Sequence, residues 1–532
     1  MLSRLLVLLC VAGVAQVAAA AGLGGIRVDD RVFVDEFGRQ RLFHGVNAVF
    51  KVAPWHPVLT GFDSNNTLSS DDAKLLQSYG FNSVRLGVMW PGLEPTTEGQ
   101  YDSSYLDSLE TIVDTLAAAG IYTLLDLHQD LFHRKFCGEG VPDWVYSKCA
   151  KVYTGKPFPS PVVKTGPYPV DSEGNPELSS CLSKSFFDYY LTAEVSAAFQ
   201  CLYDNQDGLW TSLGNAWSAV AARFKDKPSV LGYEVLNEPW MGDVFKHPSL
   251  AIPGNTEKKF LEPLYNHVIA MIRQVDAVKP VFFEGLTIDY WPSGFSAVPG
   301  GDANKAVLSY HIYCMPDPSK AEAVLCSGVN DEFFEMRNKD SQRLGVATMM
   351  TEFGATSSAS KGALHDLDSL ARQTDKHQQS WQYWQYKYYA DLTTCTPSGE
   401  SLFNNDGTPA TEKLDVLTRP YPSAIAGTLQ SYEFGKTQQQ FVLKYGLLQG
   451  EALPASGPEA ATTVVRLHSA MHFPRGLSVT VTGTGASKVA VQCVDGSTLH
   501  LLQTQPDAAA ASSVEVTLSA NCGGVGGDKC TC

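Results

Sequence analysis

The chain has 532 residues, of which 44% are apolar, 11% aromatic and 18% charged. This composition can bury a large core and argues against a disordered protein, which would have few aromatic residues and a high charge density. The formal net charge of −16 argues against a cationic surface that binds a nucleic-acid backbone, so we expect no nucleic-acid partner. The length predicts two or three domains, or one large barrel with an appended domain.

The N-terminal segment has the composition of a secretory signal peptide. Arg4 precedes an apolar run over residues 5–15, and the small residues 18–20 suit peptidase cleavage. An uncleaved membrane anchor is the alternative, because a segment of this length can nearly span a bilayer, but Gln16 and the weakly apolar alanines favour cleavage. We therefore expect residues 1–21 to be removed. The mature protein is expected to be a soluble monomer, either secreted or sent to a lysosome-like compartment.

The cysteines agree with a secretory route. The chain contains twelve, and only Cys10 precedes residue 22. The remaining cysteines are too dispersed for a zinc ribbon. Sequence neighbours such as Cys137 with Cys149, or Cys314 with Cys326, suit disulfide bonds, but spacing alone does not determine the pairing. The sequon Asn65-Asn66-Thr67 predicts a glycosylated surface loop.

Short, apolar, β-rich segments alternate with helical segments from about residue 41 to 387. The helical segment 105–119 carries one apolar face and ends at Gly120, and Ser69 or Ser70 suits the start of an earlier helix. Near-continuous apolar runs are typical of parallel strands that are covered on both faces. Eight such strands favour a (β/α)8 (TIM) barrel over an open doubly wound sheet, and no glycine-rich phosphate loop follows the first strand. The predicted strands are 41–49, 81–90, 122–129, 230–239, 281–285, 307–313, 346–354 and 381–387.

The sequence pattern changes after residue 420. Short alternating segments separated by Gly, Pro, Asp and Ser predict an antiparallel β-sandwich, with strands at 439–443, 462–467, 477–481, 489–493 and 514–518. We therefore expect a catalytic barrel over residues 22–420 and a β-sandwich with a Gly-rich tail over residues 421–532. For this second domain we favour a bracing role over lipid or glycan binding.

Polar residues gather where the predicted barrel strands end, which is where barrel enzymes keep their reacting groups. Glu238 follows the fourth strand and Glu352 ends the seventh, so the two carboxylates would face each other across the barrel mouth. The candidate binding residues around them are Lys51, Arg85, His128, Asp130, Asn237, His311, Tyr313 and Trp384.

Two facing carboxylates suit glycoside hydrolysis. One protonates the leaving oxygen while the other attacks the anomeric carbon, and a separation of about 5 Å predicts retention through a covalent intermediate. Arg85 would keep the nucleophile ionised, whereas burial would keep the acid protonated. Asn237 suits a sugar 2-hydroxyl, and Trp384 offers a flat apolar face for a pyranose ring.

Other charged residues near the predicted strand ends have simpler interpretations. Glu94, Glu139 and Glu284 are interpreted as solvated or salt-bridged groups, although Glu139 is placed to line the pocket. His311 on its own would be a hydrogen-bonded core histidine. A metal site built from His128, Asp130 and His311 has no H-x-x-x-H spacing to support it, so we expect neither a metal nor a cofactor.

These motifs resemble glycoside hydrolase family 5, a retaining (β/α)8 family. The resemblance implies that Glu238 is the acid/base and Glu352 the nucleophile. The repeated aromatic residues at 381–387 leave open which ring stacks on the sugar. The residues that match the family pattern are Arg85, His128, Asn237-Glu238-Pro239, His311 with Tyr313, Glu352 and Trp384.

Longer segments are similar to endoglycoceramidases, which cleave the β-glucosidic bond between a glycan and ceramide and carry a C-terminal β-sandwich. The similar segments are 44–47 with Lys51, 126–130, 134–144 and 232–240. This resemblance implies a glycosphingolipid substrate, taken from a membrane or micelle surface, with Lys51 and Asp130 in contact with the head-group sugars. We expect an apolar groove for the ceramide chains, lined by the insertion 131–226 and by loops after strands six to eight.

Three alternatives remain open at this point. An exo-acting glucosylceramidase or β-glucosidase, or an endoglucanase on soluble β-glucan, would use the same carboxylates. A lectin-like glycolipid-binding protein would keep the pocket without turnover.

Overall fold

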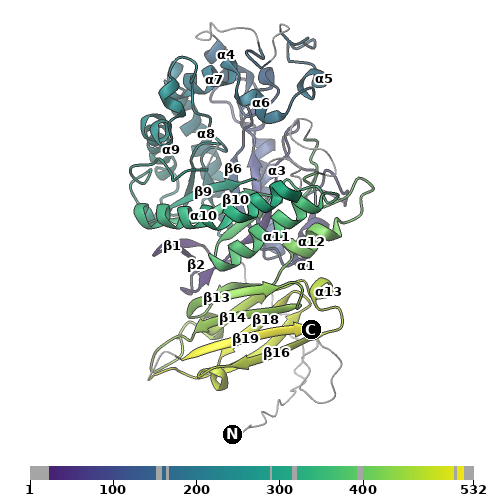
Figure 1. The fold of residues 1–532 in the computed structure, drawn as a ribbon. Coiled ribbons are helices and arrows are strands. Elements are labelled where there is room, and N and C mark those ends of the chain that lie inside the picture. Colours follow the sequence, from purple (N-terminus) through teal and green to yellow (C-terminus); the bar gives the residue numbers. More distant parts are fainter. Residues whose placement is uncertain are drawn as a thin grey trace.

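A computed structural model describes residues 23–150, 158–162, 167–287, 290–313, 320–391, 399–508 and 512–520, with the backbone alone described over 320–327. The expected signal peptide, and the side chains of Cys314 and Cys326, fall outside this description. Among the described helices, none combines the length and apolar character that a membrane crossing requires. The chain is organised as a barrel surrounded by helices, with a pair of β-sheets at one end (Figure 1).

Eight parallel strands close into a barrel, which confirms the predicted (β/α)8 fold. The ring closes where β11 pairs with β4. Every residue of these strands is buried, which explains why the segments read as nearly continuous apolar runs. The strands are β4 (His44–Ala48), β5 (Ser83–Val88), β6 (Tyr122–Leu127), β7 (Val230–Glu234), β8 (Val281–Glu284), β9 (Ala306–Ile312), β10 (Ala347–Phe353) and β11 (Ser380–Tyr383).

Helices cover the outside of the barrel. The hydroxyl of Ser69 caps α1 (Ser70–Ser78), and the Asp72 carboxylate accepts from the Ser69 amide in a capping box. The predicted helix at 105–119 is α3 (Ser103–Ala118), which ends before Gly120. The others are α2 (Trp90–Leu93), α8 (Leu209–Phe224), α9 (Glu262–Arg273), α10 (Lys320–Leu344), α11 (Lys361–Lys376) and α12 (Thr411–Leu417), and β8 is followed by the 3-10 helix η5 (Ala303–Lys305).

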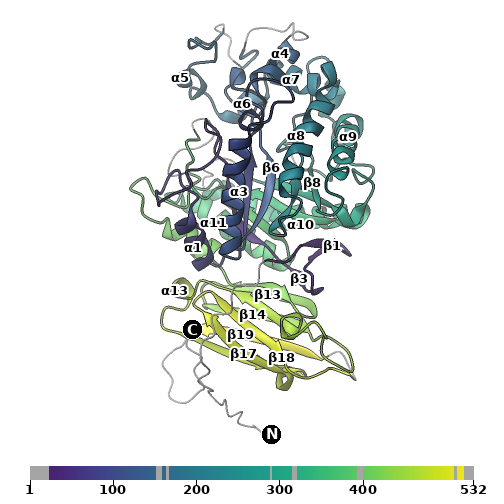
Figure 2. The same ribbon diagram turned by 180° about the vertical axis from the view of Figure 1, so that it is seen from behind.

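The insertion between β6 and α8 lies over the carboxyl ends of the strands. Its helices α4 (Asp143–Ala150), α5 (Leu178–Cys181), α6 (Phe186–Tyr190) and α7 (Ala193–Tyr203) lie at the end of the molecule farthest from the C-terminal sheets (Figures 1 and 2).

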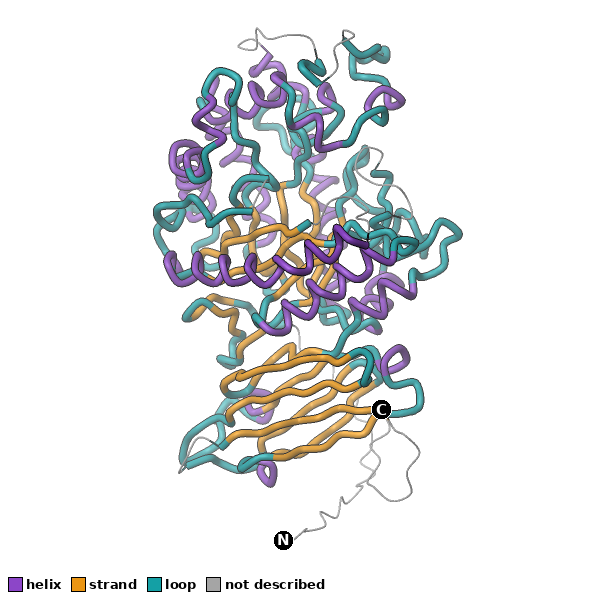
Figure 3. Tube along the Cα trace, viewed as in Figure 1, coloured by secondary structure: helices purple, strands orange, loops and turns teal. Residues whose placement is uncertain are grey.

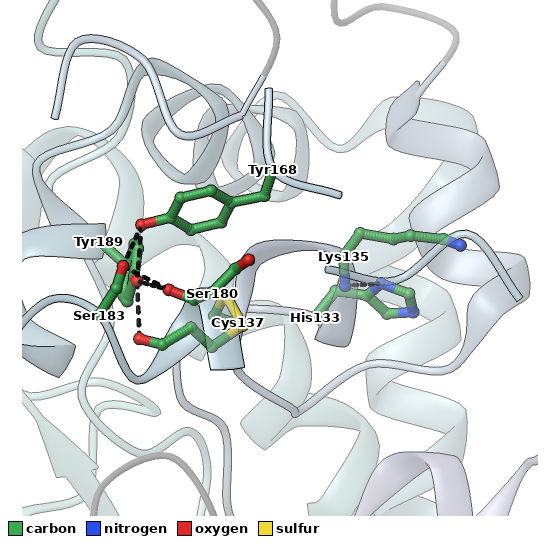
Figure 4. The surroundings of a disulfide bond; sticks show 8 residues. His133, Lys135, Cys137, Tyr168, Ser180, Ser183 and Tyr189 are labelled. Carbon is green, nitrogen blue, oxygen red and sulfur yellow. Dashed lines mark hydrogen bonds between the residues drawn. A yellow bond between two sulfur atoms is a disulfide. The ribbon is translucent and has the colours of Figure 1, made fainter. Parts of the chain in front are cut away.

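Two disulfides fasten this insertion, joining Cys137 to Cys181 and Cys149 to Cys201. The suggested pairing of Cys137 with Cys149 is therefore wrong, because each partner lies near in space but far along the chain. Beside the first disulfide, the Tyr189 hydroxyl donates to the carbonyl of Cys181 at 2.7 Å (Figure 4). These links tie α5 and α6 to the segment that follows β6.

The C-terminal domain contains two antiparallel sheets that share one apolar core, as the predicted β-sandwich requires. The larger sheet has the order β1-β2-β3-β12-β15-β18-β17, so three short strands near the N-terminus extend it: β1 (Arg27–Asp29), β2 (Val32–Val34) and β3 (Gln40–Arg41). The smaller sheet has the order β13-β14-β19-β16. The remaining bounds are β12 (Tyr421–Ile425), β13 (Thr428–Gly435), β14 (Gln440–Gly446), β15 (Thr462–Arg466), β16 (Leu477–Thr482), β17 (Val489–Asp495), β18 (Thr498–Gln503) and β19 (Ser513–Ala520).

The sandwich packs against the amino-terminal end of the barrel. Arg466 donates to the carbonyls of Phe81 and Gly120, which lie just before β5 and β6. A buried ion pair of 2.8 Å joins Arg419, before β12, to Asp375 of α11. The two sheets therefore lie at the end of the barrel opposite to the strand ends that carry the predicted site (Figure 3).

Candidate active site

The polar residues singled out in the sequence lie together at the carboxyl ends of the barrel strands. Glu238 follows β7, and Glu352 lies in β10. One carboxylate oxygen of each, together with a ring nitrogen of His311, lie within 4.8 Å of one another. This spacing agrees with the roughly 5 Å that separates the carboxyl groups of retaining glycosidases, whereas inverting enzymes need about 6.5–9.5 Å.

Arg85 on β5 is fully buried and holds the network around these carboxylates together. Its register opposite Asn47 of β4 points both side chains into the barrel. Burial opposes its charge, but Asp126, Glu234 and Glu352 outweigh burial and raise the pKa of Arg85 well above its ordinary value. The guanidinium donates to Glu352 (2.5 Å), Glu234 (2.5 Å), Asn237 (2.7 Å) and Asn47 (3.0 Å).

Glu352 is held from both sides. Arg85 donates to its Oε1, and the Tyr313 hydroxyl donates to its Oε2 at 2.8 Å. Burial raises the pKa of Glu352, and His311 and Arg85 oppose that rise. Burial also lowers the pKa of His311 to about 4, so at neutral pH Arg85 is the cation hydrogen-bonded to Glu352 that favours its ionised form. The expectation that Arg85 keeps Glu352 ionised is therefore incomplete, because burial changes the pKa of Glu352 more than Arg85 does.

Glu238 has different neighbours. Its Oε1 lies 2.7 Å from Nδ1 of His311, and its amide donates to Oε2 of Glu284 at 2.7 Å while the backbone adopts a φ of 41°. Burial, and then the negative charge of Asp130, raise the pKa of Glu238 to about 8. The carboxyl group therefore carries a proton at neutral pH, as general acid catalysis requires.

A second buried cluster extends from these carboxylates toward β4, β6 and the segment after β11. Nζ of Lys51 lies 2.6 Å from Asp130, 2.9 Å from Asp391 and 3.6 Å from Glu139. Nε2 of His128 lies 3.1 Å from Asp130. Burial opposes the charge of His128, but Asp130 and Asp126 raise its pKa to about 10, so charged groups of both signs line this side. Such an array suits sugar hydroxyls, which both donate and accept hydrogen bonds.

The structure shows which aromatic ring of residues 381–387 faces the site. Trp384 stacks on His128 with ring centroids 5.1 Å apart, lies against the Lys51 ammonium and donates from Nε1 to Glu400 at 2.7 Å. Trp381 instead stacks on His44, away from the carboxylates. Trp384, which directly follows β11, therefore borders the polar cluster.

The sequence suggests that three carboxylates in or beside the site are solvated or salt-bridged. Glu139 is buried and pairs with Lys51, which agrees with a salt bridge and with its expected place in the pocket. Glu284 is buried and accepts from the Glu238 amide, so it is not solvated. Glu94 is also buried, and it accepts from the indole of Trp90, which gives it a structural role in α2. Glu284 ends β8, and this strand-end position could have indicated its role as the acceptor of the Glu238 amide. Asp391 and Glu400 follow β11 in an irregular segment and carry no such signal.

Among the residues that the structure describes, three groups of side chains have ligand atoms near enough to hold a cation: His128 with Asp130 and Glu139, Glu234 with Glu284 and His311, and Glu238 with His311 and Glu352. Each group already contacts a protein cation. Lys51 pairs with Asp130, and Arg85 pairs with Glu234 and Glu352. These carboxylates are thus neutralised by side chains of the chain itself.

Comparisons with known families agree with this geometry. The cellulase (glycosyl hydrolase family 5) model matches residues 51–390, and the glycoside hydrolase family 5 C-terminal domain matches residues 419–517. The chain belongs to glycoside hydrolase family 5. This result confirms the family resemblance seen in the sequence and makes the protein an O-glycosyl hydrolase.

Individual relatives cover most of the chain. An endoglycoceramidase from Hydra vulgaris is 40% identical over 85% of this chain and 82% of its own length, and one from Cyanea nozakii is 38% identical over 87% and 88%. Among solved structures, endo-glycoceramidase II from Rhodococcus sp. has a TM-score of 0.70 at 24% identity, over 92% of this chain and 99% of that one. The same Rhodococcus protein has been solved as a ganglioside GM3 complex, which has a TM-score of 0.69 at 22% identity over 92% and 99%. These structures share the fold of this chain.

Proposed function

We propose that the protein is an endoglycoceramidase, a retaining hydrolase that cleaves the β-glucosidic bond between the glycan and the ceramide of glycosphingolipids. The pair Glu238 and Glu352, within 4.8 Å of each other and in unlike surroundings, carries the reaction type. The similarity to the endoglycoceramidases from Hydra vulgaris and Cyanea nozakii, over more than four-fifths of their length, supports the substrate class.

In the first proposed step, the Glu352 carboxylate attacks the anomeric carbon while Glu238 gives its proton to the ceramide oxygen. The bond between that carbon and oxygen breaks, and ceramide leaves as an alcohol. In the second step, Glu238 takes a proton from water, which attacks the glycosyl–Glu352 ester and releases the glycan with its original configuration. Arg85 and Tyr313 hold Glu352 in place and stabilise its charge when the ester breaks.

The sugars would lie along the buried cluster of Lys51, Asp130, His128 and Trp384. Asn237 donates one amide hydrogen to the carbonyl of Gln129, and its second amide hydrogen suits a sugar 2-hydroxyl. The expected apolar groove for the lipid chains remains a proposal. The exposed apolar residues follow β6, β7 and β8, so they favour a groove close to the acid Glu238. The sequence suggests that loops after β9, β10 and β11 line part of this groove.

Mass spectrometry of the products from a mixed glycosphingolipid extract tests the proposal. Release of intact oligosaccharides together with ceramide is expected. Glucose as the sole sugar product would favour an exo-acting glucosylceramidase or β-glucosidase, and activity confined to soluble β-glucan would favour an endoglucanase. A protein that binds glycolipid and releases nothing would contradict catalysis, and the variant Glu352→Gln provides the matched inactive control.

We further propose that the mature protein is a glycosylated monomer, secreted or sent to a lysosome-like compartment after loss of residues 1–21. The two disulfides of the insertion suit an oxidising compartment, and Asn65 of the sequon is exposed. The intact mass of the mature protein, before and after enzymatic removal of N-glycans, measures both cleavage and glycosylation. Light scattering measures the oligomeric state.

A further inference from the structure

Large apolar side chains on the surface are concentrated at one end of the molecule. Fourteen such side chains in the described part of the chain are at least 40% exposed, and all but Val278, Val329 and Val494 lie in the insertion after β6 or in the loops that follow β4, β7 or β8. Those loops are at the carboxyl ends of the strands, where the catalytic carboxylates lie. Scattered exposed apolar residues are ordinary on a protein surface, whereas their concentration on one face marks an interaction surface.

Six of these residues form what we call the apolar rim: Leu182, Phe187, Phe245, Ile252, Tyr290 and Trp291, which are between 42% and 58% exposed. They come from three separate parts of the chain, namely the insertion after β6 and the loops after β7 and β8. Leu182 follows α5 and Phe187 lies in α6, and both helices are at the end of the molecule away from the C-terminal sheets (Figures 1 and 2).

The apolar rim is connected to the reacting groups by direct contacts. The ring of Phe187 packs on Trp240, with centroids 6.3 Å apart, and Trp240 is two residues after the acid Glu238. On the other side, the Tyr290 hydroxyl donates to the carbonyl of Tyr313 at 2.9 Å, and Tyr313 donates to Glu352. The rim thus begins at the catalytic pair, whereas the charged cluster around Lys51 lies in the segments that follow β4, β6 and β11.

We propose that the apolar rim docks the enzyme onto the surface of a zwitterionic phospholipid bilayer, with the mouth of the barrel facing the lipid. This proposal rests on the proposed function, in which the leaving group is a ceramide anchored in such a bilayer. Aromatic side chains prefer the membrane interface, where a ring meets both lipid chains and head groups, and Phe187, Phe245, Tyr290 and Trp291 supply four. The net charge of −16 makes an anionic bilayer unfavourable, so the occupant is an uncharged surface.

Sedimentation with vesicles of phosphatidylcholine alone tests this surface. The triple variant Leu182→Ser/Ile252→Ser/Trp291→Ser removes one exposed apolar side chain from each part of the rim. Because binding strength follows the apolar area that enters the interface, its vesicle partition coefficient should fall by about tenfold or more. The double variant Val278→Ser/Val494→Ser, which removes exposed apolar side chains elsewhere, is the matched control and should bind like the wild type.

Cleavage of a soluble β-glucoside reports whether each variant is folded with an intact active site, and we expect it to be unchanged. Vesicle binding by the triple variant at the wild-type level, equal loss in the control, or no binding by the wild type would each overturn the docking proposal. The vesicles contain no glycolipid, so this result does not depend on turnover. Vesicle binding through the rim by a protein that releases no ceramide would contradict the proposed function and leave docking supported.

Discussion

The two carboxylates at the barrel mouth differ in their partners more than in their burial. Glu352 accepts hydrogen bonds from Arg85 and Tyr313. Glu238 is instead hydrogen-bonded to His311, whose imidazole is neutral above about pH 4. A fixed cation favours the ionised form of an acid, and burial without one favours the protonated form. This difference is the physical basis for assigning attack to Glu352 and proton transfer to Glu238.

Replacement of each carboxylate should give a distinct chemical signature. Glu352→Ala should lower kcat by about 10³-fold or more, because the covalent route is lost. Glu238→Ala should still form the glycosyl-enzyme from a substrate with an activated leaving group, since that group needs no proton. Added azide should then release a β-glycosyl azide from Glu238→Ala and an α-glycosyl azide from Glu352→Ala. NMR of the products distinguishes the two, and the reverse pattern would contradict the assignment.

The pH dependence follows from the proton on Glu238. This proton is bound below the pKa of about 8 and is lost above it, so kcat/KM for an unactivated substrate should fall by about tenfold per pH unit above that value. The same limb should be absent when Glu238→Ala is assayed with an activated aryl glycoside. A basic limb that persists in that variant would show that another group controls it.

Glu284 offers a test of how the acid is positioned. Burial, and then the nearby Glu238 and Glu234, raise the pKa of Glu284 well above its ordinary value and so favour its protonated form. Glu284→Gln mimics that neutral form and keeps an acceptor for the Glu238 amide, so activity and the basic limb near pH 8 should persist. Glu284→Ala removes the acceptor and should lower kcat by roughly tenfold or more. If Glu284→Gln moves the basic limb downward, Glu284 is ionised in the wild type and the interpretation is wrong.

Some parts of the site could be found from the sequence because barrel topology brings strand ends together. Glu238 and Glu352 stand in sharp motifs at such ends, and their proximity follows from the fold. Asp391 and Glu400 could not be found in this way, since they lie after the last barrel strand and reach the site through long-range contacts with Lys51 and Trp384. Loop geometry of this kind depends on packing that one sequence does not display.

The stability of the insertion over the barrel mouth depends on its two disulfides. The bond between Cys149 and Cys201 spans 52 residues, and in the chain-entropy model a loop of this length stabilises the fold by about 4 kcal/mol. Cys149→Ser/Cys201→Ser should therefore lower the unfolding temperature measured by calorimetry. The exposed change Lys184→Ser in the same insertion serves as control and should leave it unchanged. An unaltered unfolding temperature in the double variant would show that packing alone holds the insertion.

The predicted elements were most reliable where burial is complete. All eight barrel strands were found, because parallel strands covered on both faces read as apolar runs. In the sandwich, the sequence prediction missed β12, β13 and β18. In β13, a register shift between Leu429 and Ser431 interrupts the alternation. The two-residue strand β3 and the three-residue strands β1 and β2 carry too little pattern to be recognised. Strand β1 pairs with β2 and β2 with β3, and only β3 of the three pairs with β12, which is distant along the chain.

At the scale of the whole molecule, the two ends have separate tasks. The carboxyl ends of the barrel strands carry the catalytic residues and the apolar rim, and the amino ends meet the sandwich. The ion pair of Arg419 with Asp375 is only 2% exposed on each side and joins the two domains. A bracing domain at this end should influence stability without touching the chemistry.

Arg419→Met tests this division of tasks. Loss of one partner from a buried ion pair costs about 3–5 kcal/mol, so the unfolding temperature should fall at pH 8, whereas kcat/KM for a soluble β-glucoside at 25 °C should stay near the wild-type value. Burial already raises the pKa of Asp375 to about 7 against the opposing charge of Arg419, and removal of Arg419 should raise it further. A folded-state pKa above the unfolded value costs stability as the pH rises between the two. Both proteins therefore lose stability up to about pH 7, and only the variant continues to lose it above that pH, so its deficit relative to the wild type should grow as the pH rises above about 7. The double variant Asp375→Asn/Arg419→Met leaves no unpaired charge and should recover part of the loss at pH 8. If Arg419→Met stays folded but loses activity on the soluble substrate, the sandwich contributes to catalysis and does more than brace the barrel.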